Sequence, residues 1–389
     1  MHHHPARSWV EINARALAHN ISTLRTIVGD EVILAPCVKA NGYGHDSALV
    51  SEIFLEAGAD WLCVDSLREA QHLRQRGITA PIYIFGYVMK DELEEVVRLS
   101  CKIMLNDREH VSLLQHYAQI HNRIIDVHLK VETGINRQGK RPEDILAFAQ
   151  YVHEQSHLRI EGISTHFANI EDVKRHDFAA VQQERFDDVC TMLAKEGITI
   201  PIRHCANSAA TLMYPETHYE MVRPGVICYG IWPSPLFREL YTQDADVVHD
   251  FQVAAAWKTC VAHIKHVPAG ESIGYGRTFY APSDMTIAIL PVGYYDGYDR
   301  RLSNVGYVMI GGEKCQVVGR VCMNMIMVDI TPIASTVSLE DEVLILGSDA
   351  HTGASIHMDE IAALQDRISY ELPTRILSHT HGDIPRIRV

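Results

Sequence analysis

Lys39 is the residue whose type and position most clearly suggest chemistry. It directly follows the apolar, β-branched run VILAPCV (32–38) and opens the segment KANGYG. An amine desolvated at the end of a buried strand stays nucleophilic near neutral pH, and such an amine forms a Schiff base with a carbonyl group. Lys39 is therefore a candidate for covalent catalysis. The alternative is an ordinary strand-end lysine that faces water.

The elements around Lys39 alternate, up to about residue 240, between short β-branched runs and longer stretches with helical periodicity. This pattern predicts parallel strands joined by crossover helices. Eight strands are expected, at 32–38, 61–64, 81–85, 101–105, 125–131, 160–165, 200–205 and 219–223. Eight such units predict a (β/α)8 TIM barrel, in which active-site groups lie where the strands end. Lys39 would then stand at the mouth of the barrel.

The segments after the seventh and eighth expected strands, HCANSAAT (204–211) and RPGVICYG (223–230), are suited to bind an anion. Phosphate groups in such barrels usually lie at these two loops. Asn207 or Ser208 can cap the short helix that follows, so that free backbone N–H groups face a phosphate, and Gly225 lets the backbone approach closely. A plain helix cap without a ligand is the alternative.

The chain changes character after about residue 245, where apolar runs are separated by Gly, Pro, Asn and Asp and only HMDEIAALQD (357–366) predicts a helix. The fold class is therefore α/β plus β. We expect a barrel domain over 8–245 and a mostly β domain over 246–389, with a strand near 8–13 as a candidate to join the second domain.

The composition narrows the function classes. A formal net charge of -14 opposes nonspecific binding to nucleic acid, and no run of apolar residues is long enough for a membrane span. Nine cysteines without a CxxC pair favour neither a disulfide framework nor a zinc site, so we expect no metal and a cytoplasmic location.

Several strings along the chain together resemble alanine racemases in order and spacing. They are WVEINARALAHN, VKANGYGHD, KVETGINRQG, EGISTHFAN, HCANSAA, RPGVICYG, GESIGYGRTF, PVGYYDGYDRR, VGRVCMN and SYELP. The resemblance implies a barrel of the fold-type III class that carries pyridoxal 5'-phosphate (PLP) and a β domain that completes the active site of the partner subunit in a head-to-tail homodimer. It also implies interconversion of L-alanine and D-alanine, which supplies D-alanine for peptidoglycan.

The resemblance assigns Lys39 as the Schiff-base lysine and one of two acid/base groups, and Tyr275, reaching in from the partner subunit, as the other. Racemisation needs proton transfer on both faces of Cα, which two opposed groups provide. His166 would belong to the hydrogen-bonding network of Tyr275. Arg223 would bond the pyridine nitrogen. Because arginine cannot accept a proton, that nitrogen would stay unprotonated and the cofactor would be a weaker electron sink, which disfavours transamination.

The other implied roles concern binding. Arg137 would contact the phenolic oxygen of the cofactor and the substrate carboxylate, and Lys130 is the candidate for carbamylation, with an outward-facing strand lysine as the alternative. Met323 matches a partner-subunit residue near the substrate carboxylate. The residues that the resemblance assigns to the cofactor, besides Lys39, His166 and Arg223, are Tyr43, Asn207, Ser208, Gly225, Val226 and Tyr370.

Two residues depart from the family pattern: we expect Glu132 to have little effect and Asn324 to bear on substrate choice. Glu132 and Asn324 stand where aspartate is frequent, and a neutral Asn324 beside Met323 changes the field at the substrate entry. A serine or broad-specificity racemase is therefore the first alternative. A barrel-plus-β decarboxylase is disfavoured because that class has a glutamate at the position of Arg223, and a noncatalytic PLP-binding protein is disfavoured because it lacks a β domain.

Overall fold

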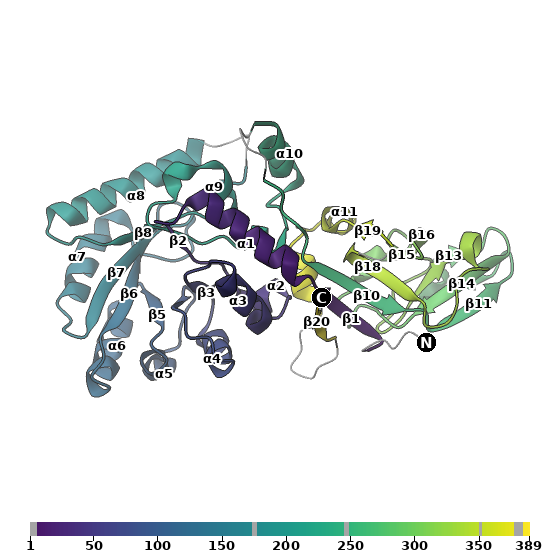
Figure 1. Ribbon diagram of the computed structural model, residues 1–389, viewed down its shortest axis with the longest axis horizontal. Helices are drawn as coiled ribbons and strands as arrows, with labels where there is room; N and C mark the ends of the chain where they lie inside the picture. The colour runs from purple at the N-terminus through teal and green to yellow at the C-terminus, as the bar shows by residue number, and fades with distance from the viewer. Residues whose placement is uncertain (1–5, 173–176, 245–248, 350–351, 377–383) are drawn as a thin grey trace.

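A computed structural model describes residues 6–172, 177–244, 249–349, 352–376 and 384–389. In these residues the eight strands expected for the barrel are confirmed, and they form its wall (Figure 1). They are β2 (Ile33–Leu34), β3 (Leu62–Val64), β4 (Ile82–Ile84), β5 (Lys102–Leu105), β6 (Ile125–Lys130), β7 (Leu158–Ser164), β8 (Ile202–His204) and β9 (Met221–Val222).

The parallel order of these strands follows the chain. Strands β3 to β8 pair in sequence, and β2 pairs with β9. The two sheets join at both seams: Cys37 forms a parallel bridge with Cys63, and the Glu220 N–H donates to the Arg203 carbonyl at 3.3 Å. The wall is thereby closed, so that side chains at the carboxyl ends of the strands converge on one mouth.

Helices surround the barrel (Figure 1). Their ends follow local sequence signals: Ser66 and Glu69 form a capping box at α4, and α7 begins at Pro142, a residue suited to the first helical turn. The helical elements of this half are α1 (Ala14–Val28), α2 (Lys39–Tyr43), α3 (Ser47–Glu56), α4 (Leu67–Gln75), η1 (Lys90–Glu92), α5 (Leu93–Arg98), α6 (Arg108–Ile120), α7 (Pro142–His153), α8 (Asp177–Lys195), α9 (Ser208–Met213), η2 (Pro215–Thr217), η3 (Val226–Tyr229) and α10 (Pro235–Asp244). No helix of the described ranges is long and apolar enough to cross a membrane.

The second half is built mainly from antiparallel strands. One sheet has the order β16-β15-β18-β10-β1-β20 with β19 on β18, a second has β11-β14-β17, and β12 pairs with β13. The strands are β1 (Ser8–Ile12), β10 (Ala255–Cys260), β11 (His263–Val267), β12 (Ser272–Ile273), β13 (Phe279–Tyr280), β14 (Met285–Leu290), β15 (Tyr307–Ile310), β16 (Glu313–Gln316), β17 (Ile326–Asp329), β18 (Glu342–Ser348), β19 (Ser355–Ile356) and β20 (Arg386–Arg388). The short helical elements are η4 (Tyr275–Arg277), η5 (Arg300–Leu302), η6 (Thr331–Ile333), α11 (Met358–Ala363) and α12 (Glu371–Arg375).

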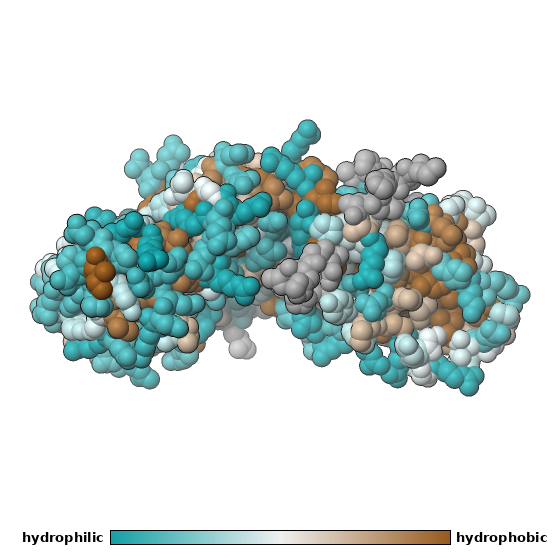
Figure 2. Space-filling view, turned by 90° about the horizontal axis from the view of Figure 1, so that it is seen from below, coloured by the Kyte–Doolittle hydropathy of each residue, from teal (hydrophilic) through white to brown (hydrophobic). Residues whose placement is uncertain are grey.

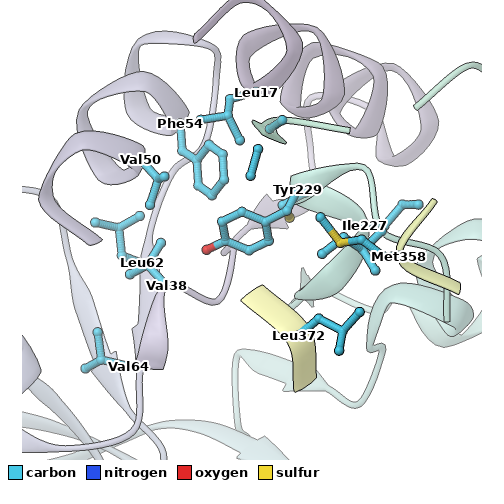
Figure 3. Close-up of a cluster of buried hydrophobic side chains, with 14 of the residues drawn as sticks. Leu17, Val38, Val50, Phe54, Leu62, Val64, Ile227, Tyr229, Met358 and Leu372 are labelled. Atoms are coloured by element: carbon cyan, nitrogen blue, oxygen red, sulfur yellow. The ribbon is translucent and has the colours of Figure 1, made fainter. Parts of the chain in front are cut away.

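A buried cluster joins the barrel to the C-terminal segment. Figure 3 shows Tyr229 between Phe54 on one side and Met358 and Leu372 on the other. The Tyr229 hydroxyl donates to the Cys37 carbonyl at 2.9 Å. Arg386 of β20 adds a hydrogen bond of 2.8 Å to the Gly44 carbonyl. These contacts hold the C-terminal segment, with Tyr370, against the barrel mouth.

Candidate active site

A cavity of about 340 Å³ lies at the carboxyl ends of the barrel strands. Its wall brings together side chains that are far apart in the sequence, because consecutive strands end at the same rim. Most of the predicted site residues line it, namely Lys39, Tyr43, Lys130, Arg137, His166, Asn207, Ser208, Arg223, Gly225, Val226 and Tyr370.

Lys39 and Tyr43 reach the cavity through an unusual backbone turn. Ala40, Asn41 and Gly42 have φ values of 53°, 55° and 63°, so α2 is a left-handed turn rather than a continuous right-handed helix. Left-handed conformations cost roughly 1–2 kcal/mol for each residue that carries a Cβ, and such strain concentrates at functional sites. The Asn41 side chain holds the turn by accepting from the Ser47 N–H at 3.1 Å. The Lys39 Nζ lies 5.1 Å from the centroid of the Phe85 ring.

The Arg223 side chain is buried, and two groups of the protein hold its guanidinium. One terminal nitrogen donates to the Thr165 carbonyl at 3.2 Å, and the other faces Nδ1 of His204. No other hydrogen bond of the Arg223 side chain is found among the described residues, so its remaining N–H donors can meet a ligand in the cavity. An arginine held in this way donates hydrogen bonds and cannot accept them.

Positive charge dominates the cavity. Burial, and then the nearby Arg223 and Arg137, hold the pKa of Lys130 well below its ordinary value. Among the described residues, the Lys130 amine has no hydrogen-bond partner. Burial, and then Lys130, Arg223, Arg137 and Lys39, likewise hold the pKa of His166 well below its usual value. At neutral pH the site therefore favours a neutral imidazole at His166, and it is poised to receive anions.

One end of the cavity has hydrogen-bond donors next to a glycine, Gly225. Asn207, rather than Ser208, caps α9 by accepting from the Ala210 N–H at 3.0 Å. The Ser208 hydroxyl oxygen accepts from the Gly225 N–H at 2.9 Å, which leaves its proton to donate elsewhere. A Cβ on Gly225 would stand 2.7 Å from the Tyr43 hydroxyl oxygen, so this close approach requires glycine.

Glu132, one of the two departures noted in the sequence, shapes the loop of Arg137. Its carboxylate accepts from the backbone N–H groups of Gly134 at 2.6 Å and of Arg137 at 3.1 Å. A carboxylate that accepts two backbone bonds rigidifies the turn. Glu132 thus acts on the position of Arg137 from outside the cavity wall.

Tyr275 and Met323 are not among the described residues that line the cavity. Both belong to the β-rich half, and their side chains are 73% and 53% exposed. Figure 2 shows apolar residues gathered on the surface of this half. Large exposed apolar side chains of this kind are typical of a surface that meets another molecule.

The sequence interpretation missed several residues of the cavity wall. Tyr83, Phe85 and Met104 lie on or directly after β4 and β5 and face the cavity. Their position at a strand end was a usable signal, because side chains there point toward the barrel mouth. They were overlooked because aromatic and apolar side chains in strands usually indicate core.

A closed eight-stranded barrel, with a lysine and an arginine in one cavity at its mouth and a β-rich half after it, defines a two-part barrel enzyme. Residues 12–233 match the family model of the alanine racemase N-terminal domain, and residues 254–383 match that of the alanine racemase C-terminal domain. The chain belongs to the alanine racemase family, which comprises isomerases that act on amino acids.

Individual relatives resemble the chain over nearly its whole length. An alanine racemase of Desulforamulus reducens is 38% identical over 383 residues, covering 98% of both chains. The solved alanine racemase of D-cycloserine-producing Streptomyces lavendulae has a TM-score of 0.90 at 29% identity and covers 100% of this chain and 98% of its own. That of Bacillus anthracis, solved with bound L-Ala-P, has a TM-score of 0.89 at 29% identity, with coverage of 100% and 96%.

Proposed function

We propose that this chain interconverts L-alanine and D-alanine with pyridoxal 5'-phosphate as cofactor. The observation that carries the proposal is that Lys39, His166 and Arg223 line one cavity together with the donor-rich end formed by Tyr43, Ser208 and Gly225. Membership of the alanine racemase family supports the substrate. The Bacillus anthracis relative was solved with bound L-Ala-P, which supports a small amino acid as ligand.

The donor set of the cavity fits this cofactor. Lys39 would hold its aldehyde carbon covalently, and Arg223 would donate to the ring nitrogen. The Tyr43 and Ser208 hydroxyls, with the backbone at Gly225 and Val226 and with Asn207 and Tyr370 nearby, would hold the phosphate. The absence of a Cβ at Gly225 leaves the room that Tyr43 needs there. When bound, the cofactor supplies an electron sink that makes the substrate Cα–H more acidic.

We propose two groups of the protein for the two faces of Cα. Lys39 would move the proton on one face, and Tyr275 of a second copy would move it on the other. The exposure of Tyr275 and Met323 outside their own cavity supports a homodimer in which each β-rich half completes the partner's site. A neutral His166 would accept a hydrogen bond from Tyr275 and help it to release its proton.

Lys130 is proposed to be carbamylated. Its lowered pKa favours the neutral amine, which adds to CO2 to form the carbamate anion and release one proton. The new anion would offset the charges of Arg137 and Arg223 and would hold Arg137 toward the carboxylate of the substrate. The product, D-alanine, would serve peptidoglycan synthesis in the cytoplasm.

The test is to incubate the purified protein with L-alanine, L-serine and L-lysine in deuterium oxide. We expect D-alanine to form with deuterium at Cα, and Lys39→Ala to remove the visible absorbance of lysine-bound cofactor. If L-serine is racemised faster than L-alanine, the substrate is serine rather than alanine. The proposal fails if none of the three is racemised while that absorbance is present.

A further inference from the structure

Arg223 is the end of a row of polar side chains, three of them buried and the last partly buried, that crosses the barrel interior. Its guanidinium faces His204 Nδ1, His204 Nε2 lies 2.7 Å from His128 Nδ1, and His128 Nε2 lies 3.1 Å from a carboxylate oxygen of Glu161. Both histidines are 0% exposed. We name Arg223, His204, His128 and Glu161 the relay.

The chemistry of the donors determines where every proton of the relay lies. Arg223 only donates, so Nδ1 of His204 must accept, and the ring proton of His204 must sit on Nε2. His128 then accepts at Nδ1 and carries its own proton on Nε2, which it donates to Glu161. Protonation of either ring would set two N–H groups against each other. The relay therefore has one consistent arrangement, with two neutral imidazoles and a Glu161 oxygen as the final acceptor.

The electrostatic surroundings agree with this arrangement. Burial, and then the charge of Arg223, hold the pKa of His204 well below its ordinary value, and burial is also the main cause of the lowered pKa of His128. The Tyr83 ring packs against both imidazoles, with centroid distances of 4.5 Å to His128 and 5.5 Å to His204. In such a low-dielectric interior, a satisfied polar network is rigid, and an unsatisfied one is costly.

A β-bulge between β6 and β7 brings Glu161 into the relay. The pairing of β6 with β7 shifts register between Val127 and His128, so that Val127 pairs with Ile160 but His128 pairs with Gly162. Glu161 is therefore the extra residue on β7, and a bulge of this kind can redirect a side chain. Gly162 leaves room for the ring, because a Cβ there would come within 2.2 Å of His128 Nδ1.

The far end of the relay is a pair of opposite charges. Lys102 Nζ lies 2.6 and 2.7 Å from the two carboxylate oxygens of Glu161, and 2.9 Å from Asp126. Lys102 thereby pairs with the same carboxylate that accepts from His128. Among the described residues, the Asp126 carboxylate accepts from Lys102 and from Arg159 and not from His128, so it provides a comparison for Glu161.

We propose that Glu161, acting through His128 and His204, is a positioning residue that holds Arg223 in the orientation from which it meets the cofactor ring. The proposal rests on the function proposed above. Loss of the Glu161 charge frees the histidines to exchange their ring protons, and a proton on Nδ1 of His204 repels Arg223. The relay thus extends the active site from the barrel mouth into the barrel interior.

The first experiment is neutron diffraction from deuterium-exchanged wild-type crystals. We expect deuterium on Nε2, and none on Nδ1, of both His128 and His204. Deuterium on Nδ1 of either ring overturns the proposal. This measurement needs no variant and no turnover, so it tests the relay even if the protein racemises no amino acid.

The second experiment compares Glu161→Gln with Asp126→Asn, since each removes one carboxylate charge next to Lys102. The side-chain amide that Glu161→Gln introduces can accept from His128 or donate to it, so the variant can fold with either arrangement of ring protons, and thermal melting checks its folding. We expect Glu161→Gln to lower kcat for alanine about tenfold, to leave KM within about twofold and to shift the cofactor absorbance, with Asp126→Asn close to wild type. Equal kcat and equal absorbance in the two variants overturn the proposal.

Discussion

The Tyr43 hydroxyl packs directly against Gly225: a Cβ on residue 225 would stand only 2.7 Å from the hydroxyl oxygen. The two residues come from opposite ends of the barrel sequence, and they meet because β2 pairs with β9. Their contact lies at the proposed phosphate end of the cavity and can be tested directly.

Gly225→Ala is expected to weaken retention of pyridoxal 5'-phosphate about tenfold, because the added methyl displaces the Tyr43 hydroxyl. Gly225 has φ of -117°, so alanine brings no left-handed strain. Equilibrium dialysis of the cofactor measures the effect. The double variant with Tyr43→Phe is the control, since the added methyl should cost little once the hydroxyl is gone. Full additivity of the two changes would contradict the contact.

Tyr275→Phe is expected to slow proton transfer on one face of Cα much more than on the other. Loss of a general acid or base costs about 10²-fold to 10⁴-fold on the face it serves. Exchange of the Cα hydrogen with solvent deuterium should therefore fall steeply for one enantiomer of alanine and much less for the other, with the cofactor absorbance intact. NMR of each enantiomer measures the two rates. Equal slowing of both would argue against the assignment.

A mixture of Lys39→Ala and Tyr275→Phe chains tests whether active sites are shared. If each site takes Lys39 from one chain and Tyr275 from the other, a heterodimer contains one intact site. Refolding equal amounts together should recover about one quarter of wild-type activity, since half of the dimers are mixed. Each variant refolded alone is the control. No recovery, with heterodimers present, would place both residues in the same chain's site.

Carbamylation of Lys130 is expected to give a carbamate signal in the ¹³C NMR spectrum of protein equilibrated with ¹³C-bicarbonate. The neutral amine favoured by burial is the form that adds CO2. Lys130→Gln should lose the signal, and Lys140→Gln, which changes a nearby lysine, should keep it. A wild-type spectrum without the signal would leave Lys130 as an unmodified neutral amine.

His45 is expected to make the protein less stable in acid. Its Nδ1 donates to the Tyr43 carbonyl at 3.0 Å, while among the described residues the buried Nε2 has no partner for a second proton. Burial lowers the pKa of His45 from 6.5 to about 4, so the unfolded chain binds more protons in that range, and the free energy of unfolding falls as the pH decreases from 6.5 toward 4.

Between pH 7 and pH 5 this single histidine should account for about 2 kcal/mol of lost stability. Urea unfolding at the two pH values measures the loss. His45→Gln cannot titrate, so its stability should depend on pH less steeply by that amount. An unchanged pH dependence in this variant would mean that His45 has the same pKa in the folded and the unfolded chain.

The sequence alone determined the parts that depend on local signals. Each expected strand of the barrel overlaps an observed one, because apolar runs bounded by turn residues are a property of neighbours in the chain. Lys39 was found for the same reason, since strand ends can be located without knowing which strands pair, whereas Arg223 was assigned by the family resemblance. The resemblance to a family added roles for these residues, which the experiments above test.

Only the tertiary structure decided the features that depend on strand pairing and on contacts between distant residues. One apolar run, FQVAAAWKTCVAHIKHV (251–267), divides at Val261 into β10 and β11. The two strands enter different sheets because their pairing partners lie elsewhere in the chain. The left-handed turn after Lys39 is held by contacts with Ser47. Glu161 enters the relay only because of the register shift opposite His128. Pairing register is a long-range property, so no local pattern could place Glu161 at the far end of the row that begins at Arg223.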